Sequence, residues 1–176
     1  MGITKTKLSG SAENMNIGDG NYNVWLSSRN SKKGGVKLLS KKNKAVKNVK
    51  IGEGMAEVMK IMIKGKGKGK KREVAVTYVP PKTNAWNQEE YKGMLSDTVN
   101  CFKKILQESR NITLMRDFNC KEICWKNWIT QGEELWGYTQ LNLLMINTMT
   151  QWTRETTRVR GNEEASRFDL LFTKRD

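Results

Sequence analysis

Histidine is absent from the 176 residues, and cysteine is scarce. Without an imidazole, the chain lacks the commonest general acid and base, so hydrolytic chemistry would need other groups. The three cysteines form an odd number with no dense framework, which predicts free thiols in a reducing, intracellular setting. Cys120 and Cys124 have no histidine or further cysteine pair to complete a zinc site, so zinc binding is not expected.

Long apolar runs are also missing. No stretch approaches the roughly 20 apolar residues that a membrane-spanning helix needs. The first ten residues, MGITKTKLSG, lack the apolar segment of a secretory signal peptide. We therefore expect an intracellular protein with no membrane partner, and the nucleus is a candidate compartment. The sequence gives no indication of the oligomeric state.

Positive charge is present in excess. The 32 Lys and Arg residues outnumber the 18 Asp and Glu residues, for a net charge of +14. Such a field favours polyanions, nucleic acid (DNA above all) or an acidic membrane face, with a merely soluble basic protein as the plain alternative. We expect weak, sequence-independent binding of nucleic acid, with dissociation constants of roughly 10⁻⁴ to 10⁻⁶ M at physiological salt.

The charge is densest in KGKGKGKKR, residues 64–72, where six cations alternate with three glycines. This composition fits neither a stable helix nor a core strand, so we expect a mobile basic loop between two strands. The loop either contacts phosphates in a salt-dependent way or is a solvated spacer. The residues expected to bind nucleic acid are Lys64, Lys66, Lys68, Lys70, Lys71, Arg72 and Arg158.

Hydrophobic patterning predicts one mixed α/β domain over residues 1–176. The expected strands span 22–26, 36–40, 55–63, 73–79, 111–115 and 167–172. A helix is expected to follow Asn87, a suitable N-cap with Glu90 three residues later, because apolar residues then recur every three or four positions. A second helix is expected over 133–147, and a loop over 154–166.

Three of these strands carry polar groups near their ends. VTYVPPKT (76–83) places Tyr78 before a double proline, and ASRFDLLFT (165–173) contains Asp169. LMRDFNCKEICW (114–125) holds Asp117 and Asn119, which would point to the same face of an extended strand. A tyrosine, an amide and two carboxylates suit metal-assisted phosphodiester hydrolysis. Each residue alone would be an ordinary strand-end residue, and the combination is more specific.

These segments together resemble the endonuclease/exonuclease/phosphatase superfamily, and most of all the endonuclease domain of non-LTR (LINE-type) retrotransposons. The similarity also includes TKTKLSGS (4–11), RNSKKGGV (29–36) and TTRVRG (156–161). It implies a DNase I-like, two-sheet β-sandwich flanked by helices, and Mg²⁺-dependent nicking of DNA. The continuation CKEICW (120–125) favours the retrotransposon branch over those that act on phospholipids or inositol phosphates.

The resemblance also implies roles for individual residues. Tyr78 would help to place the scissile phosphate, and Asp117 would activate the attacking water. Asn119 would bind phosphate, and Asp169 would orient a catalytic histidine.

The chain departs from the family pattern at the metal position. Lys5 stands where the family has a metal-binding glutamate, a change of two charge units. A unit charge ~4 Å from another contributes about 4 kcal/mol at an effective dielectric constant of ~20, so we do not expect Mg²⁺ to bind well. Arg116 replaces the glycine of the family's G-D-F-N motif.

The ends of the chain depart from the pattern as well. We expect the family's first strand to be missing ahead of Lys5, and the histidine-bearing segment to be missing after Asp176. The domain is therefore expected to be incomplete and catalytically impaired. The alternatives are a non-catalytic, basic nucleic-acid-binding module and a translated transposon remnant without a selected function.

Overall fold

The computed structural model describes residues 2–4, 20–27, 35–44, 46–65, 71–120, 122–132, 135–157 and 169–174. The strands of its two main sheets are β1 (Gly2–Thr4), β2 (Tyr22–Ser27), β3 (Val36–Lys41), β4 (Val46–Ile51), β5 (Glu57–Lys64), β6 (Lys71–Tyr78), β7 (Ile112–Asp117), β10 (Thr150–Gln151) and β11 (Asp169–Lys174). The helices are α1 (Gln88–Glu108) and α2 (Leu135–Ile146), and a separate short pair is formed by β8 (Ile123–Cys124) and β9 (Ile129–Thr130).

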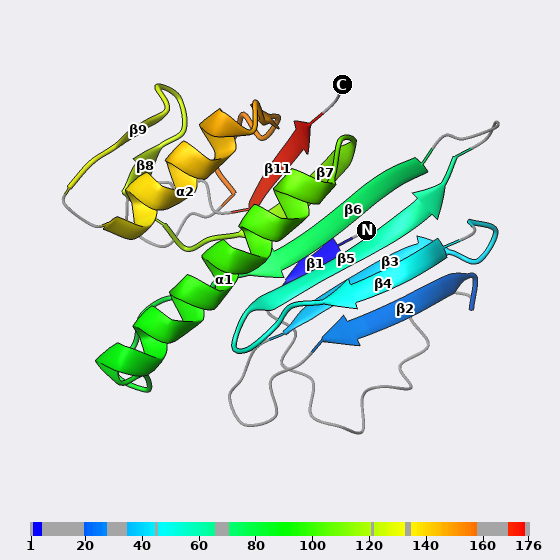
Figure 1. The fold of residues 1–176 in the computed structure, drawn as a ribbon, viewed down its shortest axis with the longest axis horizontal. Helices are drawn as coiled ribbons and strands as arrows, with labels where there is room; N and C mark the ends of the chain where they lie inside the picture. The colour runs from blue at the N-terminus through cyan, green and yellow to red at the C-terminus, as the bar shows by residue number, and fades with distance from the viewer. Residues whose placement is uncertain are drawn as a thin grey trace.

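The described strands form two stacked sheets, with the helices on the outer face of the larger one (Figure 1). The larger sheet has the order β10-β11-β7-β6-β5-β4, and the smaller has the order β1-β3-β2. Neighbouring strands are antiparallel except for β6 and β7, which are parallel and joined through α1. The two-sheet α/β sandwich predicted from the sequence is confirmed.

Two apolar layers hold the sandwich together. Between the sheets lie the buried residues Val36, Leu38, Met59, Ile61, Val74, Val76 and Tyr78. The opposite face of the larger sheet packs against the helices through residues such as Ala75, Leu114, Phe102 and Phe172. Because successive strand residues point to opposite faces, the alternation of these two sets along β5, β6, β7 and β11 fixes which face each residue takes.

Helix α1 begins where the sequence predicts. Asn87 is the N-cap, and its side-chain oxygen accepts a hydrogen bond of 2.7 Å from the backbone N–H of Glu90. The predicted apolar stripe contacts the core, with Met94, Phe102 and Leu106 almost fully buried. No helix in the described residues is long and apolar enough to cross a membrane.

Other elements differ from the expectations. A short strand that the sequence did not predict, β1, precedes Lys5, pairs antiparallel with β3 and places Thr4 opposite Val36. The basic loop is shorter than expected, since Lys64 belongs to β5 while Lys71 and Arg72 belong to β6. Residues 66–70 lie outside the described residues, as do 158–166 of the loop expected over 154–166. Strands β4, β8, β9 and β10 were not predicted.

Candidate functional site

Four polar residues from neighbouring strands line up in register at one end of the larger sheet. Glu57 starts β5 opposite Tyr78, the last residue of β6. Tyr78 pairs with Asp117 at the end of β7, and Asp117 pairs with Asp169 at the start of β11. We call Glu57, Tyr78, Asp117 and Asp169 the polar row. Adjacent strands lie about 4.8 Å apart, so the row spans about 14 Å, and its two aspartates are direct neighbours.

The polar row faces the smaller sheet. Tyr78 belongs to the apolar layer between the sheets. Glu57 lies two and four residues before Met59 and Ile61 of that layer, so it points to the same face of β5. Leu170, the neighbour of Asp169 in β11, points to the helix side. Exposure increases along the row: Glu57 and Tyr78 are each 2% exposed, Asp117 is half-buried and Asp169 is exposed. A ligand would therefore reach the row from its aspartate side.

We expected Asn119 on an extended strand, but it lies beyond the end of β7. Its φ of 45° is left-handed, a conformation that asparagine tolerates better than most residues. The Asn119 backbone N–H donates to the Asp117 carboxylate at 3.1 Å, and its side-chain amide donates to the Val79 carbonyl at 2.8 Å. These bonds tie the ends of β6 and β7 together and hold Asp117 and Asn119 close to each other.

Arg116 does not point toward the polar row. Its side chain is 2% exposed and lies on the helix side, with its guanidinium carbon 3.1 Å from the ring centre of Phe118 and 4.2 Å from that of Phe172. Burial lowers the pKa of Arg116 well below its usual value. Within the described residues, Nε and Nη2 make no hydrogen bond. Arg116 therefore places its charge among the apolar side chains on the helix side and does not enter the polar row.

The segment that follows β10 forms hydrogen bonds with β11 beside Asp169. The Thr157 hydroxyl accepts a hydrogen bond of 3.0 Å from the Asp169 backbone N–H, and the Thr153 hydroxyl accepts one of 3.0 Å from that of Leu171. Residues 152–157 thus run alongside β11 toward the row. The sequence predicted a loop here and missed the contact.

The remaining predicted site residues are elsewhere or not described. Lys64, Lys71 and Arg72 lie at the opposite end of the larger sheet, because β5 and β6 extend from Glu57 and Tyr78 to these cations. Lys5, Lys66, Lys68, Lys70 and Arg158 lie outside the described residues. Glu57 was missed by the sequence interpretation, although its spacing from Met59 and Ile61 could have indicated an inward-facing carboxylate.

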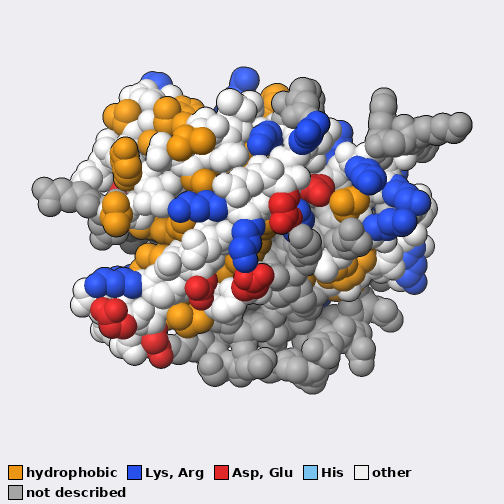
Figure 2. All heavy atoms as spheres, viewed as in Figure 1, with side chains coloured by type: hydrophobic (Ala, Val, Ile, Leu, Met, Phe, Trp, Pro, Cys, Tyr) orange, Lys and Arg blue, Asp and Glu red, His pale blue; other side chains and the backbone are white. Residues whose placement is uncertain are grey.

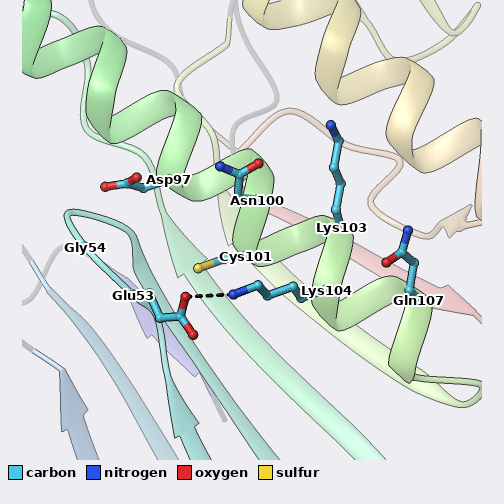
Figure 3. Close-up of a pocket in the computed structure, with 8 residues that line it drawn as sticks. All are labelled: Glu53, Gly54, Asp97, Asn100, Cys101, Lys103, Lys104 and Gln107. Carbon is cyan, nitrogen blue, oxygen red and sulfur yellow. Dashed lines mark hydrogen bonds and ion pairs between the residues drawn. The ribbon is translucent and has the colours of Figure 1, made fainter.

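An open groove lies on the helix side of the larger sheet, whereas the polar row lies on the opposite face. It has a volume of about 360 Å³ and runs between α1 and the turn from β4 to β5 (Figure 3). Glu53 and Lys104 form an ion pair of 2.7 Å across it, and Asp97 accepts a hydrogen bond of 2.9 Å from the Met55 backbone N–H. These contacts hold the β4–β5 turn against α1, so we assign the groove a structural role and not a binding role.

The sandwich with strand-end polar groups defines a DNase I-like fold of the endonuclease/exonuclease/phosphatase superfamily. The family model described as endonuclease-reverse transcriptase matches residues 73–176. The chain therefore belongs to this family. No curated protein matches the chain in sequence.

Solved structures share the fold at low sequence identity. The 3′ phosphatase NExo from Neisseria, bound to a product DNA hairpin, has a TM-score of 0.67 at 11% identity, covering 98% of this chain and 75% of that one. An AP endonuclease from Archaeoglobus fulgidus has a TM-score of 0.59 at 13% identity, with shares of 98% and 75%. The human Nocturnin catalytic domain with a bound sulfate has a TM-score of 0.53 at 14% identity, with shares of 88% and 61%.

Nucleases and phosphatases of this superfamily are generally metal-dependent. The candidate metal ligands in this chain are the carboxylate and amide oxygens at the strand ends. Carboxylate oxygens are the ligands that Mg²⁺ prefers. Among the described residues, however, no three His, Cys, Asp or Glu side chains are placed to hold one ion. Tyr78 separates Glu57 from Asp117 in the row, and the Asn119 amide is bonded to a carbonyl. The described donors do not fit a complete magnesium site, and metal-assisted attack is not a step they support by themselves.

Proposed function

We propose that this chain is the endonuclease domain of a LINE-type retrotransposon, with a phosphodiesterase site that retains its strand-end groups but is impaired in turnover. The observation that carries the proposal is the adjacency of Asp117 and Asp169 on β7 and β11, with Tyr78 next to Asp117 on β6. One phosphate and one attacking water need groups gathered within a few ångströms. The register supplies this grouping at an end of the sandwich that is open on the aspartate side.

The proposed impairment has two causes. Lys5 occupies the position of the family's metal-binding glutamate, so it would repel a cation that the carboxylate would attract. The second cause is that none of these 176 residues is a histidine that Asp169 could orient. Hydrolysis of DNA needs these groups together, and residues that act as a unit do not contribute additively.

Nicking of supercoiled plasmid in the presence of Mg²⁺ tests the proposal. We expect the unaltered chain and its Asp117→Ala variant to nick at the same background rate. Lys5→Glu alone should restore little. Lys5→Glu with an appended family-type segment that carries the histidine should nick, and Asp117→Ala in that background should abolish the nicking. Robust nicking by the unaltered chain, lost on Asp117→Ala, would contradict the proposed impairment.

A second candidate is a nucleic-acid-binding module that does not cut. It is favoured by the net charge of +14 and by the exposed Lys64, Lys71 and Arg72. A folded domain can retain electrostatic affinity for phosphates after its chemistry is lost, because the two depend on different residues. Binding of a labelled duplex without nicking would support this candidate, and the absence of binding at low salt would reject it.

A further inference from the structure

Among the described residues, seven exposed cations gather at the end of the sandwich opposite the polar row. We call this group the basic end: Lys41, Lys42, Lys44, Lys64, Lys71, Arg72 and Arg110. Only three of them belong to the loop that the sequence indicated. The others come from the last residue of β3, from the β3–β4 turn, and from the connection between α1 and β7.

The strand register brings these cations together. Lys64 lies directly opposite Lys71, and Arg72 lies opposite Ile63. Ile63 also pairs with Val46 at the start of β4, so the preceding turn with Lys44 lies beside the end of β5. Arg110 precedes Asn111, whose carbonyl accepts a hydrogen bond of 3.1 Å from the Glu73 backbone N–H. Figure 2 shows Lys and Arg side chains gathered over this end, on the right of the view.

The charge of the basic end is not neutralised within the described residues. Glu73 and Glu108 are the carboxylates near it, and both pair with the buried Lys60, at 3.4 and 3.5 Å. The ion pairs of the described residues otherwise involve Lys92 and Lys104, which lie on α1. Seven cations with no such partner produce a strong local positive potential, which attracts a polyanion.

The basic end is too far from the polar row to serve the same phosphates. Strand β6 runs from Lys71 to Tyr78, seven residue steps, which corresponds to about 23 Å at ~3.3 Å per step. A duplex advances ~3.4 Å per base pair along its axis, so a nucleic acid would need about seven base pairs to span that distance.

We propose that the basic end is a separate contact for the nucleic-acid backbone, independent of the polar row. It holds DNA or RNA by its phosphates, without reading sequence. A membrane is a poorer fit, because stable membrane attachment takes inserted apolar groups in addition to cations. None of the seven residues is apolar, and the exposed large hydrophobic residues concentrate on α2, at Leu135, Tyr138, Met145 and Ile146. The inference rests on the proposal that the chain binds nucleic acid, but it requires no turnover.

Two variants with equal charge change test the position of the contact. The first is Lys44→Gln, Lys64→Gln, Lys71→Gln and Arg72→Gln, and the second is Lys82→Gln, Lys92→Gln, Lys126→Gln and Arg154→Gln. All eight residues are exposed, and each set removes three lysines and one arginine. Binding of a fluorescent 20-base-pair duplex is measured by anisotropy over a series of salt concentrations. Thermal unfolding verifies that both variants fold.

The basic-end variant should bind at least about tenfold more weakly at low salt, and its slope of log K against log salt should flatten by up to about 3.6. The second variant should change much less. Equal losses in the two variants would assign binding to diffuse net charge, and a larger loss in the second would move it to the polar-row end. Either result overturns the inference, whereas no binding by the unaltered chain rejects the nucleic-acid proposal itself.

Two further measurements keep the test decisive. Vesicles containing phosphatidylserine replace the duplex in a parallel titration. If the basic-end variant loses vesicle binding and keeps DNA binding, the surface serves a membrane and the inference is wrong. If the fourfold variant does not fold, Lys44→Gln with Arg72→Gln is used instead, and about half of the slope change is expected.

Discussion

The two ends of the sandwich use polar residues in opposite ways. At the polar-row end, Glu57 and Tyr78 on the inner face of the larger sheet and Arg116 on its helix side are each 2% exposed. At the basic end, Lys64, Lys71 and their neighbours are exposed on turns and strand ends. Buried polar groups affect folding through desolvation and unmade hydrogen bonds, whereas exposed charges mainly affect long-range attraction. Substitutions should therefore change stability at the first end and affinity at the second.

The largest effect on stability is expected at Phe118, directly beside the polar row. Its side chain is 1% exposed and lies against the Arg116 guanidinium and the rings of Phe102 and Trp136, with ring centres 5.6 and 6.1 Å away. Phe118→Ala should cost about 3–5 kcal/mol in urea denaturation, because it removes a large buried ring and leaves a cavity. That is a large share of a typical stability of ~5–15 kcal/mol.

The matched control for this variant is Leu171→Ala, since Leu171 is 36% exposed on the same sheet. Its cost should be well below that of Phe118→Ala. A loss below about 1 kcal/mol for Phe118→Ala would mean that the core behind the row is loosely packed, and the contrast between the two ends would fail.

Arg116 gives the next largest effect, and its sign is unusual. Stacking on Phe118 is worth about 2 kcal/mol when desolvated. Each buried donor without a partner costs about 1–3 kcal/mol, and Nε and Nη2 make no hydrogen bond within the described residues. The cost outweighs the gain, so Arg116→Met should leave the free energy of unfolding unchanged or raise it by up to about 2 kcal/mol.

Arg116→Gly is the companion variant, because glycine removes the charge without filling the space. It should be less stable than Arg116→Met, as measured by urea denaturation of both. If Arg116→Met is itself less stable than the unaltered chain by more than about 1 kcal/mol, the stacked guanidinium is a net stabilising group.

Cys120, behind the row, should make stability depend on alkaline pH. Burial raises the pKa of its thiol, and the nearby Glu122 carboxylate, whose Oε2 lies 2.9 Å from Sγ, raises it further. The unfolded chain ionises this thiol near pH 8.5. Above that pH only the unfolded state loses the proton, so the folded state loses stability by up to about 1.4 kcal/mol per pH unit.

Urea unfolding of the unaltered chain and of Cys120→Ala between pH 7 and pH 10, under reducing conditions, measures this contribution. The stability difference between the two should be constant below about pH 8 and should then shift in favour of Cys120→Ala as the pH rises. A difference that stays constant through pH 10 would show that the thiol ionises as readily in the folded chain.

Local signals in the sequence were enough to predict the main helices and strands of the fold. The N-cap at Asn87 and the apolar stripe after it define α1, and the double proline after Tyr78 marks the end of β6. Strands β8, β9 and β10 have two residues each, too few to show a period. Strand β8 pairs with the nearby β9, whereas β10 depends on β11, much later in the chain. Such elements are set by packing and cannot be predicted from propensity alone.

For the candidate site as well, local sequence signals predicted some features and long-range packing determined the others. The strand ends identified Tyr78, Asp117 and Asp169, but the register that joins them to Glu57 is long-range information. The orientation of Arg116 could have been predicted from the sequence. In a strand every second residue points to the same face, so Arg116 shares the face of Ile112 and Leu114. The left-handed conformation of Asn119 could not, because the expected strand ended at residue 115 and the pattern did not define the backbone beyond it.

The smallest effect is expected at the basic end, where stability and affinity should move in opposite directions. Lys64 and Lys71 are directly opposite each other on β5 and β6, and like charges in that position destabilise a sheet by about 0.2–1 kcal/mol. Lys64→Gln removes the repulsion, and Lys64→Glu replaces it with an attraction. Unfolding free energy at low salt should therefore rise from the unaltered chain to Lys64→Gln to Lys64→Glu, while duplex affinity falls in the same order. At 1 M salt the Debye length is ~3 Å, so the three stabilities should converge. A fall in stability across the series would mean that Lys64 is held by a favourable contact, and the basic end would then not be a surface of unneutralised charge.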